Sequence, residues 1–288
     1  MALSARCLLP ALATLGLGTP AQAEPAMWEV RDGDSAIWLF GSFHILPEGA
    51  AWRTDLFDTI LAGADRVVFE TDIRPAAAAQ VGAEAYLRGI YTDGTLLTDM
   101  LDDAAEAQLR EKAAAIDLSM GMVQAMRPWL AANTITVQAL AGQGFGSDGV
   151  ELLLLPELAE ERLGFLETGG EQLEVLAGAS DDEQVAMLVA TLEQLDELPK
   201  LTDKMLKSWM DGTPDQMGDV FITGMGAFEA AFLDRLLYAR NRNWVVSLDA
   251  MLETNSENLV VVGAAHLIGP DSILALLEEA GYAVERIQ

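Results

Sequence analysis

Short apolar runs recur along this chain at the length of β-strands. Most of them are rich in β-branched or aromatic residues and are bounded by turn-forming residues, which is typical of strands. Asp32 and Gly33 separate the first two runs, so we expect a hairpin there. The runs are residues 28–30, 37–40, 66–71, 162–168, 258–263 and 282–287.

A helical period governs the segments between these runs. Ser180 and Glu183 have the spacing of a capping box, which predicts that a helix starts there. Gly63 and Gly281 are expected to end two other helices. The expected helices are 52–63, 97–116, 180–195, 236–252 and 271–281. Their expected buried faces include Leu56, Phe57, Ile60 and Leu61; Leu101, Ala105, Leu109 and Ile116; Val185, Leu188, Leu192 and Leu195; and Ile273, Leu274, Leu277 and Ala280.

Two parts of the chain repeat one order of elements. Each has a strand, a G-x-x-H motif, a loop with proline, a helix ended by glycine, and a second strand. Pro270 in the second part fits a first helical turn. Strands joined through a helix run parallel. The predicted fold class is therefore α/β, with a central mixed, mostly parallel sheet built from two βαβ-like halves. A large helical insertion, roughly 75–255, lies within a single domain of residues 24–288.

The chain contains two histidines, and both occupy G-x-x-H motifs. They are His44, three residues after Gly41, and His266, three residues after Gly263. Groups just past the carboxyl ends of strands in open α/β sheets face the ligand crevice. We expect the glycine to let the backbone turn closely at the strand end. If the two strands are neighbours, the two imidazoles meet in one crevice.

Two converging neutral imidazoles suit a divalent transition metal. A catalytic site also needs a carboxylate, and Glu70 and Glu167 are candidates because each ends an apolar strand. A metal would act as a Lewis acid while a second carboxylate takes a proton. The alternative interpretation is that each histidine is a hydrogen-bonded structural residue and each glutamate an ordinary edge charge.

A further candidate lies in the helix 236–252. Asn241 falls within an apolar stripe, where an amide is unfavourable unless it is hydrogen-bonded. Its neighbour Arg240 could contact a substrate carboxylate or stabilise an oxyanion. An alternative of equal weight is that Arg240 and Asn241 have a structural role and tie this helix to the sheet. The stripe consists of Leu237, Asn241, Trp244, Leu248 and Met251.

Composition narrows the class of protein. The formal net charge of -28 opposes binding to nucleic acid and to anionic membranes. Residues 1–23 have the pattern of a cleaved signal peptide, which predicts a periplasmic or secreted protein with no stable membrane anchor after cleavage. Cys7, the one cysteine, falls inside that segment, so neither a disulfide nor a thiolate is expected afterwards. The glycines of 142–150 follow no strand, so we expect a loop rather than a dinucleotide site.

These motifs together resemble the TraB/GumN family, whose eukaryotic relatives include the Tiki membrane metalloproteases. The resemblance covers nearly all of residues 24–288 and is carried by the sequences "FGSFH", "VVFET", "GSDGVELLLL", "RLGFLETGGEQL", "ARN" and "VVGAAHLIGPDSILALLEEAGYAVERI". Two departures are Ser42, where the family commonly has threonine, and Glu151, where aspartate is more usual after D-G-V.

The resemblance implies an α/β fold with two histidine motifs around a divalent metal, Mn²⁺ or Co²⁺, and, from the Tiki branch, peptidase activity. Zn²⁺ is not excluded. His44 and His266 match the motif histidines and Glu70 the strand-end acid, while Arg240 and Asn241 match the R-N pair.

Our sequence-based hypothesis is an exported metal-dependent hydrolase that acts on peptides or proteins. His44, His266, Glu70 and Glu167 are the candidate ligands. Glu70, Arg240 and Asn241 are the candidate catalytic residues. Two alternatives remain open. One is a non-catalytic exported protein that binds a metal, haem or peptide. The other is a metal-free esterase with a histidine base. The oligomeric state, the substrate and the role of Glu151 are left undetermined.

Overall fold

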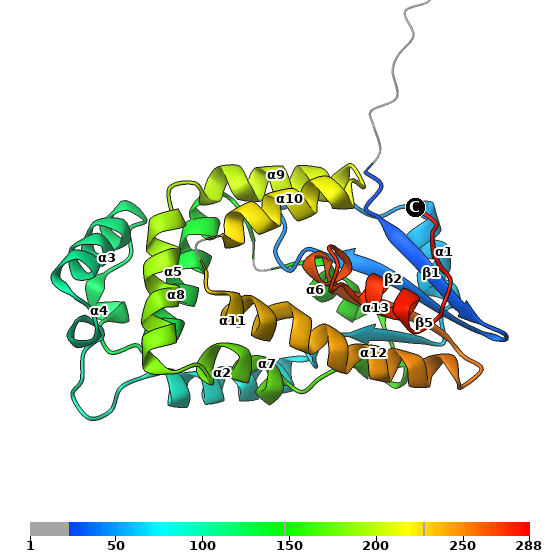
Figure 1. The fold of residues 1–288 in the computed structure, drawn as a ribbon, viewed down its shortest axis with the longest axis horizontal. Helices are drawn as coiled ribbons and strands as arrows, with labels where there is room; N and C mark the ends of the chain where they lie inside the picture. The colour runs from blue at the N-terminus through cyan, green and yellow to red at the C-terminus, as the bar shows by residue number, and fades with distance from the viewer. Residues whose placement is uncertain (1–22, 147, 227) are drawn as a thin grey trace, which may run out of the picture.

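The fold is that of a computed structural model, which describes residues 23–146, 148–226 and 228–288 (Figure 1). The predicted signal peptide, apart from its last residue, lies outside the described residues. Six strands form one sheet in the order β4-β3-β5-β2-β1-β6. They are β1 (Met27–Asp32), β2 (Ser35–Ser42), β3 (Arg66–Phe69), β4 (Leu163–Phe165), β5 (Glu257–Gly263) and β6 (Val284–Arg286).

Four neighbouring strands, β4, β3, β5 and β2, are parallel to one another. Of the six strands, β1 points in the direction opposite to the other five: it is the first strand of the hairpin with β2 and also pairs antiparallel with β6. The hairpin turn lies at Gly33 and Asp34, and Gly33 has the positive φ of 58° that such a turn favours. The prediction of a mixed, mostly parallel sheet is confirmed.

The two repeated halves interleave rather than lie side by side. The first half runs from β2 through α1 (Asp55–Gly63) to β3, yet β5 of the second half lies between those two strands. The second half runs from β5 through α13 (Ile273–Glu279) to β6, and β2 and β1 lie between its strands. Because the halves interleave, β2 and β5, the strands that precede the two histidines, are neighbours. Ser42 pairs with Gly263 at their ends.

Apolar cores cover both faces of the sheet because successive residues of a strand point to opposite faces. In β2, Trp38 and Phe40 pack with α1 and with Trp209 of α9 (Leu198–Met210). The alternate residues Ile37 and Leu39 pack on the other face, with α12 (Ala239–Leu252) and α13. Both faces being covered explains the continuous apolar runs of the parallel strands.

The predicted helical middle forms most of the remaining structure, interrupted by β4. Its far end, with α3, α4, α5 and α8, lies away from the sheet and has a core of its own (Figure 1). The further helices and turns are α2 (Pro75–Gly89), η1 (Leu97–Met100), α3 (Asp103–Ala115), α4 (Met120–Val123), α5 (Pro128–Gly142), α6 (Val150–Leu154), η2 (Leu155–Glu157), η3 (Glu160–Arg162), α7 (Gly169–Ala177), α8 (Asp181–Gln194), α10 (Pro214–Met225), α11 (Ala230–Leu233), η4 (Asp234–Tyr238) and η5 (Ala264–Leu267).

The structure corrects several local expectations. The helix expected over 97–116 divides, because Asp102 caps α3 by accepting a hydrogen bond from the backbone of Ala105. Leu56, expected in the core, is 37% exposed, and Val185 is only partly buried. Pro270 precedes α13 instead of lying in its first turn. The capping box of α8 is present as predicted.

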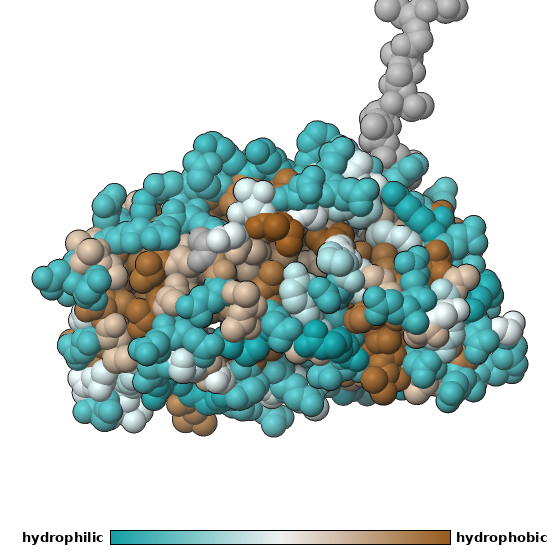
Figure 2. All heavy atoms as spheres, viewed as in Figure 1, coloured by the Kyte–Doolittle hydropathy of each residue, from teal (hydrophilic) through white to brown (hydrophobic). Residues whose placement is uncertain are grey.

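The surface reflects the acidic composition. Hydrophilic residues cover much of the face seen in Figure 2, as a net charge of -28 leads one to expect. In the described part of the chain, none of the helices has the length and apolar character needed to span a bilayer.

Candidate functional site

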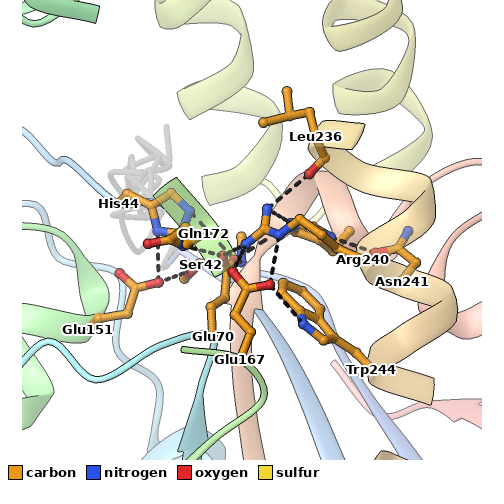
Figure 3. A network of polar contacts seen from close by, with 12 residues as sticks. Ser42, His44, Glu70, Glu151, Glu167, Gln172, Leu236, Arg240, Asn241 and Trp244 are labelled. Atoms are coloured by element: carbon orange, nitrogen blue, oxygen red, sulfur yellow. Dashed lines mark hydrogen bonds and ion pairs between the residues drawn. The ribbon is translucent and has the colours of Figure 1, made fainter. Parts of the chain in front are cut away.

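The candidate residues meet at one edge of the sheet, where four parallel strands end. His44 follows β2, Glu70 follows β3, Glu167 follows β4, and His266 lies in η5 directly after β5. Parallel strands present their carboxyl ends at a common edge, so residues far apart in sequence become neighbours. Arg240 enters the same cluster from α12 (Figure 3).

Both imidazoles lie next to the carboxylate of Glu70. The Nε2 atom of His44 is 3.7 Å from Glu70 Oε1, and Nε2 of His266 is also 3.7 Å from that oxygen. The backbone N–H of Gly263 donates to the same oxygen at 2.7 Å. Burial on its own would raise the pKa of Glu70, but His266, His44, Arg240 and this N–H lower it to about 2. The site therefore holds Glu70 as a carboxylate.

His266 is held as a neutral imidazole. Its Nδ1 lies 2.5 Å from Asn241 Oδ1, and the amide nitrogen of Asn241 donates to the carbonyl of Asp271, so the amide oxygen faces the ring. Nδ1 consequently carries the proton, and Nε2 accepts from Arg240 Nη1 at 3.2 Å. Burial is the main reason that the pKa of His266 falls to about 3, and the positive charge of Arg240 adds to it. Asn241 thus fixes the tautomer of a candidate ligand.

His44 is the accessible member of the pair, with 59% of its side chain exposed. Its Nδ1 lies 3.0 Å from Glu151 Oε1, and the hydroxyl of Ser42 donates to the same carboxylate oxygen. The packing around the ring opposes a positive charge. The charge and hydrogen bond of Glu151, followed by Glu70, outweigh that effect and raise the pKa of His44 to about 9. Glu151 therefore orients His44 as Asn241 orients His266.

A close backbone contact brings Glu151 into place. A Cβ atom at Gly149 would lie 2.1 Å from the carbonyl carbon of His44, so only glycine allows this approach. The N–H of Val150 donates to the carbonyl of Phe43 at 3.0 Å, which docks the start of α6 on the first histidine loop. Sequence reasoning left Glu151 without a role. The signal that could have found it is the D-G-V sequence directly before it.

The motif glycines act through missing side chains rather than through an unusual backbone. Gly263 has φ of -51°, which any residue can adopt, so the expected tight turn is not what requires glycine there. A Cβ at Gly263 would lie 2.8 Å from His44 Nε2. A Cβ at Gly41 would lie 3.1 Å from the backbone of Ala264. Each motif glycine makes room for a residue of the other motif.

Arg240 is a buried cation that joins the two strand-end glutamates. Its Nη2 donates to Glu70 at 2.6 Å and to Glu167 at 2.7 Å. Burial opposes the charge on Arg240, yet the hydrogen bond to Glu167 and the charges of both glutamates keep its pKa raised. Burial raises the pKa of Glu167. Both oxygens of Glu167 contact Arg240 or the indole N–H of Trp244, so acting as a metal ligand would require Glu167 to give up these contacts.

A π-helical turn sets the position of the guanidinium. In η4 the N–H of Ala239 donates to Asp234, five residues earlier, instead of four. The carbonyl of Leu236, within this turn, accepts from Arg240 Nη1 at 2.9 Å. The guanidinium carbon also lies 4.5 Å from the ring centre of Trp244. Such turns are common at functional sites because they release backbone groups from the helix pattern.

The two imidazoles and the Glu70 carboxylate are ligand types that suit a divalent ion, but they lie farther apart than the ligands of one bound ion do. Two Nε2 atoms directed at Glu70, with both Nδ1 atoms held by Glu151 and Asn241, are the second-sphere arrangement typical of metal-binding histidines. Ligands of one tetrahedral ion lie about 3–3.5 Å apart, against the 3.7 Å found for each imidazole and Glu70. Among the described residues no group of three or more histidine, cysteine or acidic side chains is already gathered closely enough to hold a metal. A small movement of the ligands, with Arg240 shifting away from His266, would be needed.

A cavity of about 330 Å³ opens beside His44. This volume is at the lower end of the roughly 300–1,000 Å³ range of small-ligand pockets. Its lining combines polar residues of the site with apolar residues of α2 and α6. The lining residues are His44, Phe69, Glu70, Thr71, Ile73, Ala78, Glu151, Leu152 and Gln172.

The fold and this site define an α/β protein with a paired-histidine centre at the carboxyl edge of a parallel sheet. The chain belongs to the TraB/PrgY/gumN family, whose model matches residues 26–286. None of the curated proteins matches the chain, and no solved structure matches it.

Proposed function

We propose that this protein is an exported metal-dependent hydrolase that acts on peptide bonds. The observation that supports it best is the convergence of both Nε2 atoms on Glu70 while each Nδ1 is fixed by a separate side chain. A structural histidine needs no such pairing with a second histidine. An open cavity next to the accessible imidazole gives a substrate access to this point.

Each residue has a distinct part in this proposal. His44 and His266 hold the ion together with Glu70, and Glu151 and Asn241 orient the two rings. A divalent ion such as Mn²⁺, Co²⁺ or Zn²⁺, when bound, would supply Lewis acidity and increase the acidity of water. Glu151 accepts from His44 Nδ1, which leaves Nε2 of that ring free to hold the ion.

Arg240 stabilises negative charge at the centre rather than binding a distant part of the substrate. Its guanidinium is enclosed by Glu70, Glu167 and the Trp244 ring, which leaves it next to the reacting groups. The structural interpretation of Arg240 and Asn241 is compatible with this role, because both residues tie α12 to the strand ends. The export part of the proposal rests on the signal-peptide pattern of residues 1–23 alone.

Metal analysis of the purified protein tests the proposal. We expect about one divalent ion per chain, and its loss in His44→Ala and in His266→Ala. Arg242→Ala is the matched control, because Arg242 lies on the same helix as Arg240 but forms an exposed ion pair with Asp234. Full metal content in either histidine variant would refute joint ligation.

Digestion of a peptide library separates the candidate activities. Cleavage that stops on addition of a chelator and returns with metal supports the peptidase. Turnover of activated esters that survives chelation would instead indicate a metal-free histidine base. A Soret band on addition of haem, without cleavage of any peptide, would favour a binding protein.

A further inference from the structure

The cavity beside His44 has accessible walls that are mainly apolar. Leu152, on α6, is 40% exposed and forms part of this wall. Ile73, just before α2, is partly exposed, and Ala78, in the first turns of α2, is exposed. These three residues come from α6, α2 and the loop before α2, so the apolar wall is a feature of the folded cavity and not of one helix.

The charged groups of the cavity are already engaged. Glu70 is 6% exposed and contacts Arg240, Gly263 and Gln172. Glu151 is 8% exposed and its Oε1 contacts both Ser42 and His44. A basic ligand would therefore lose water without gaining a well-exposed carboxylate. An acidic ligand would meet Glu70 and Glu151, and the one positive group of the lining, His44, is already paired with both of them. Both arguments favour a neutral ligand group.

We propose that this cavity is a subsite for a neutral, aliphatic or aromatic side chain of the substrate. The residue it takes lies next to the bond that is cleaved, because His44 forms one wall of the same cavity. Its place in cleavage rests on the proposed function, but the preference for an apolar group does not. Shape and apolar contact in such a pocket discriminate about 10-fold or more between side chains that differ by a methylene or two.

Binding of small amino-acid amides tests the subsite without any need for turnover. N-acetyl N-methylamides of leucine, phenylalanine, aspartate and lysine are added to the full chain, and the methyl NMR signals of Ile73 and Leu152 are followed. We expect the leucine and phenylalanine amides to shift both signals with at least 10-fold stronger binding than the charged amides. Equal binding of all four, or tighter binding of a charged one, would overturn the proposal.

Two exposed leucines of α6 provide a matched pair of variants. Leu152 lines the cavity, whereas Leu153 is 44% exposed and is not part of the lining. We expect Leu152→Asp to weaken binding of the leucine amide by about 10-fold or more and to strengthen binding of the lysine amide. Leu153→Asp should leave both affinities unchanged. Ala78→Trp should fill the space and exclude the phenylalanine amide. Identical behaviour of the two leucine variants would refute the assignment.

The same variants separate this proposal from the proposed function. If the wild-type protein cleaves peptides, cleavage should favour apolar residues at one position beside the cut, and Leu152→Asp should change that preference. If it cleaves none while the amide selectivity is found, the peptidase fails and the subsite stands. Cleavage without any preference at that position would refute the subsite and leave the peptidase intact.

Discussion

Replacing Arg240 by methionine should destabilise the protein strongly. The side chains of Arg240, Glu70 and Glu167 are only 10%, 7% and 8% exposed, and the arginine bridges the two glutamates. Methionine keeps much of the volume but leaves both carboxylates buried without their cation. Removing one member of a buried ion pair costs about 3–5 kcal/mol. With a urea m-value of about 2–3 kcal/mol/M, the unfolding midpoint should fall by about 1–2.5 M.

Urea unfolding followed by tryptophan fluorescence measures this loss, since Trp209 and Trp244 are both buried. Arg110→Met is the control. The pair Arg110–Glu106 is an exposed i,i+4 pair, so its loss should cost less than about 0.5 kcal/mol.

A second substitution tests the electrostatic cause. Glu167→Gln in the Arg240→Met background removes one of the two uncompensated charges, so it should recover part of the lost stability. In the wild-type background the same Glu167→Gln should destabilise. A loss below about 1 kcal/mol for Arg240→Met, or no recovery in the double variant, would refute the view that this cation neutralises the strand-end carboxylates.

Three further outcomes follow from the site. Gly263→Ala should displace the ring of His44 and change its imidazole NMR signal, whereas Gly82→Ala, where a Cβ meets nothing within 4 Å, should leave that signal in place. Glu151→Gln should weaken metal binding by about 10–100-fold in a competition titration with a chelator, and unchanged affinity would contradict its orienting role. Thr71→Val should raise the free energy of unfolding by about 1 kcal/mol, because the Thr71 hydroxyl is buried with no hydrogen-bond partner within the described part of the chain. Thermal unfolding measures this change, and a loss of stability would argue against the prediction.

Local sequence patterns predicted which helices and strands form better than they predicted where each one begins and ends. The strand runs and the capping box of α8 depend on neighbouring residues, and the structure has them at the expected places. The division at Asp102 was missed because a side-chain cap outweighed a continuous helical period. The exposure of Leu56 was missed because the period of a helix does not show how wide a face the sheet covers.

The site was predictable where it depends on strand ends. His44, Glu70, Glu167 and His266 could be predicted as neighbours because apolar runs end beside them, and the structure brings them together. Glu151 could not be assigned, because its contact with His44 depends on two loops that are distant in sequence meeting through their backbones. The physical need for Gly263 was also hidden, since the atom that would collide with its side chain belongs to the other motif.

The central position of β5 has a consequence for the newly made chain. This strand fills the gap between β2 and β3, but it begins almost two hundred residues after the end of β3. Until it arrives, two edges that later pair with it stay open, and Glu70 and Asn241 lack their contacts with Gly263 and His266. Synthesis must therefore pass β5 before the centre can assemble, and a chain that stops short of β5 would have β2 and β3 with no strand between them.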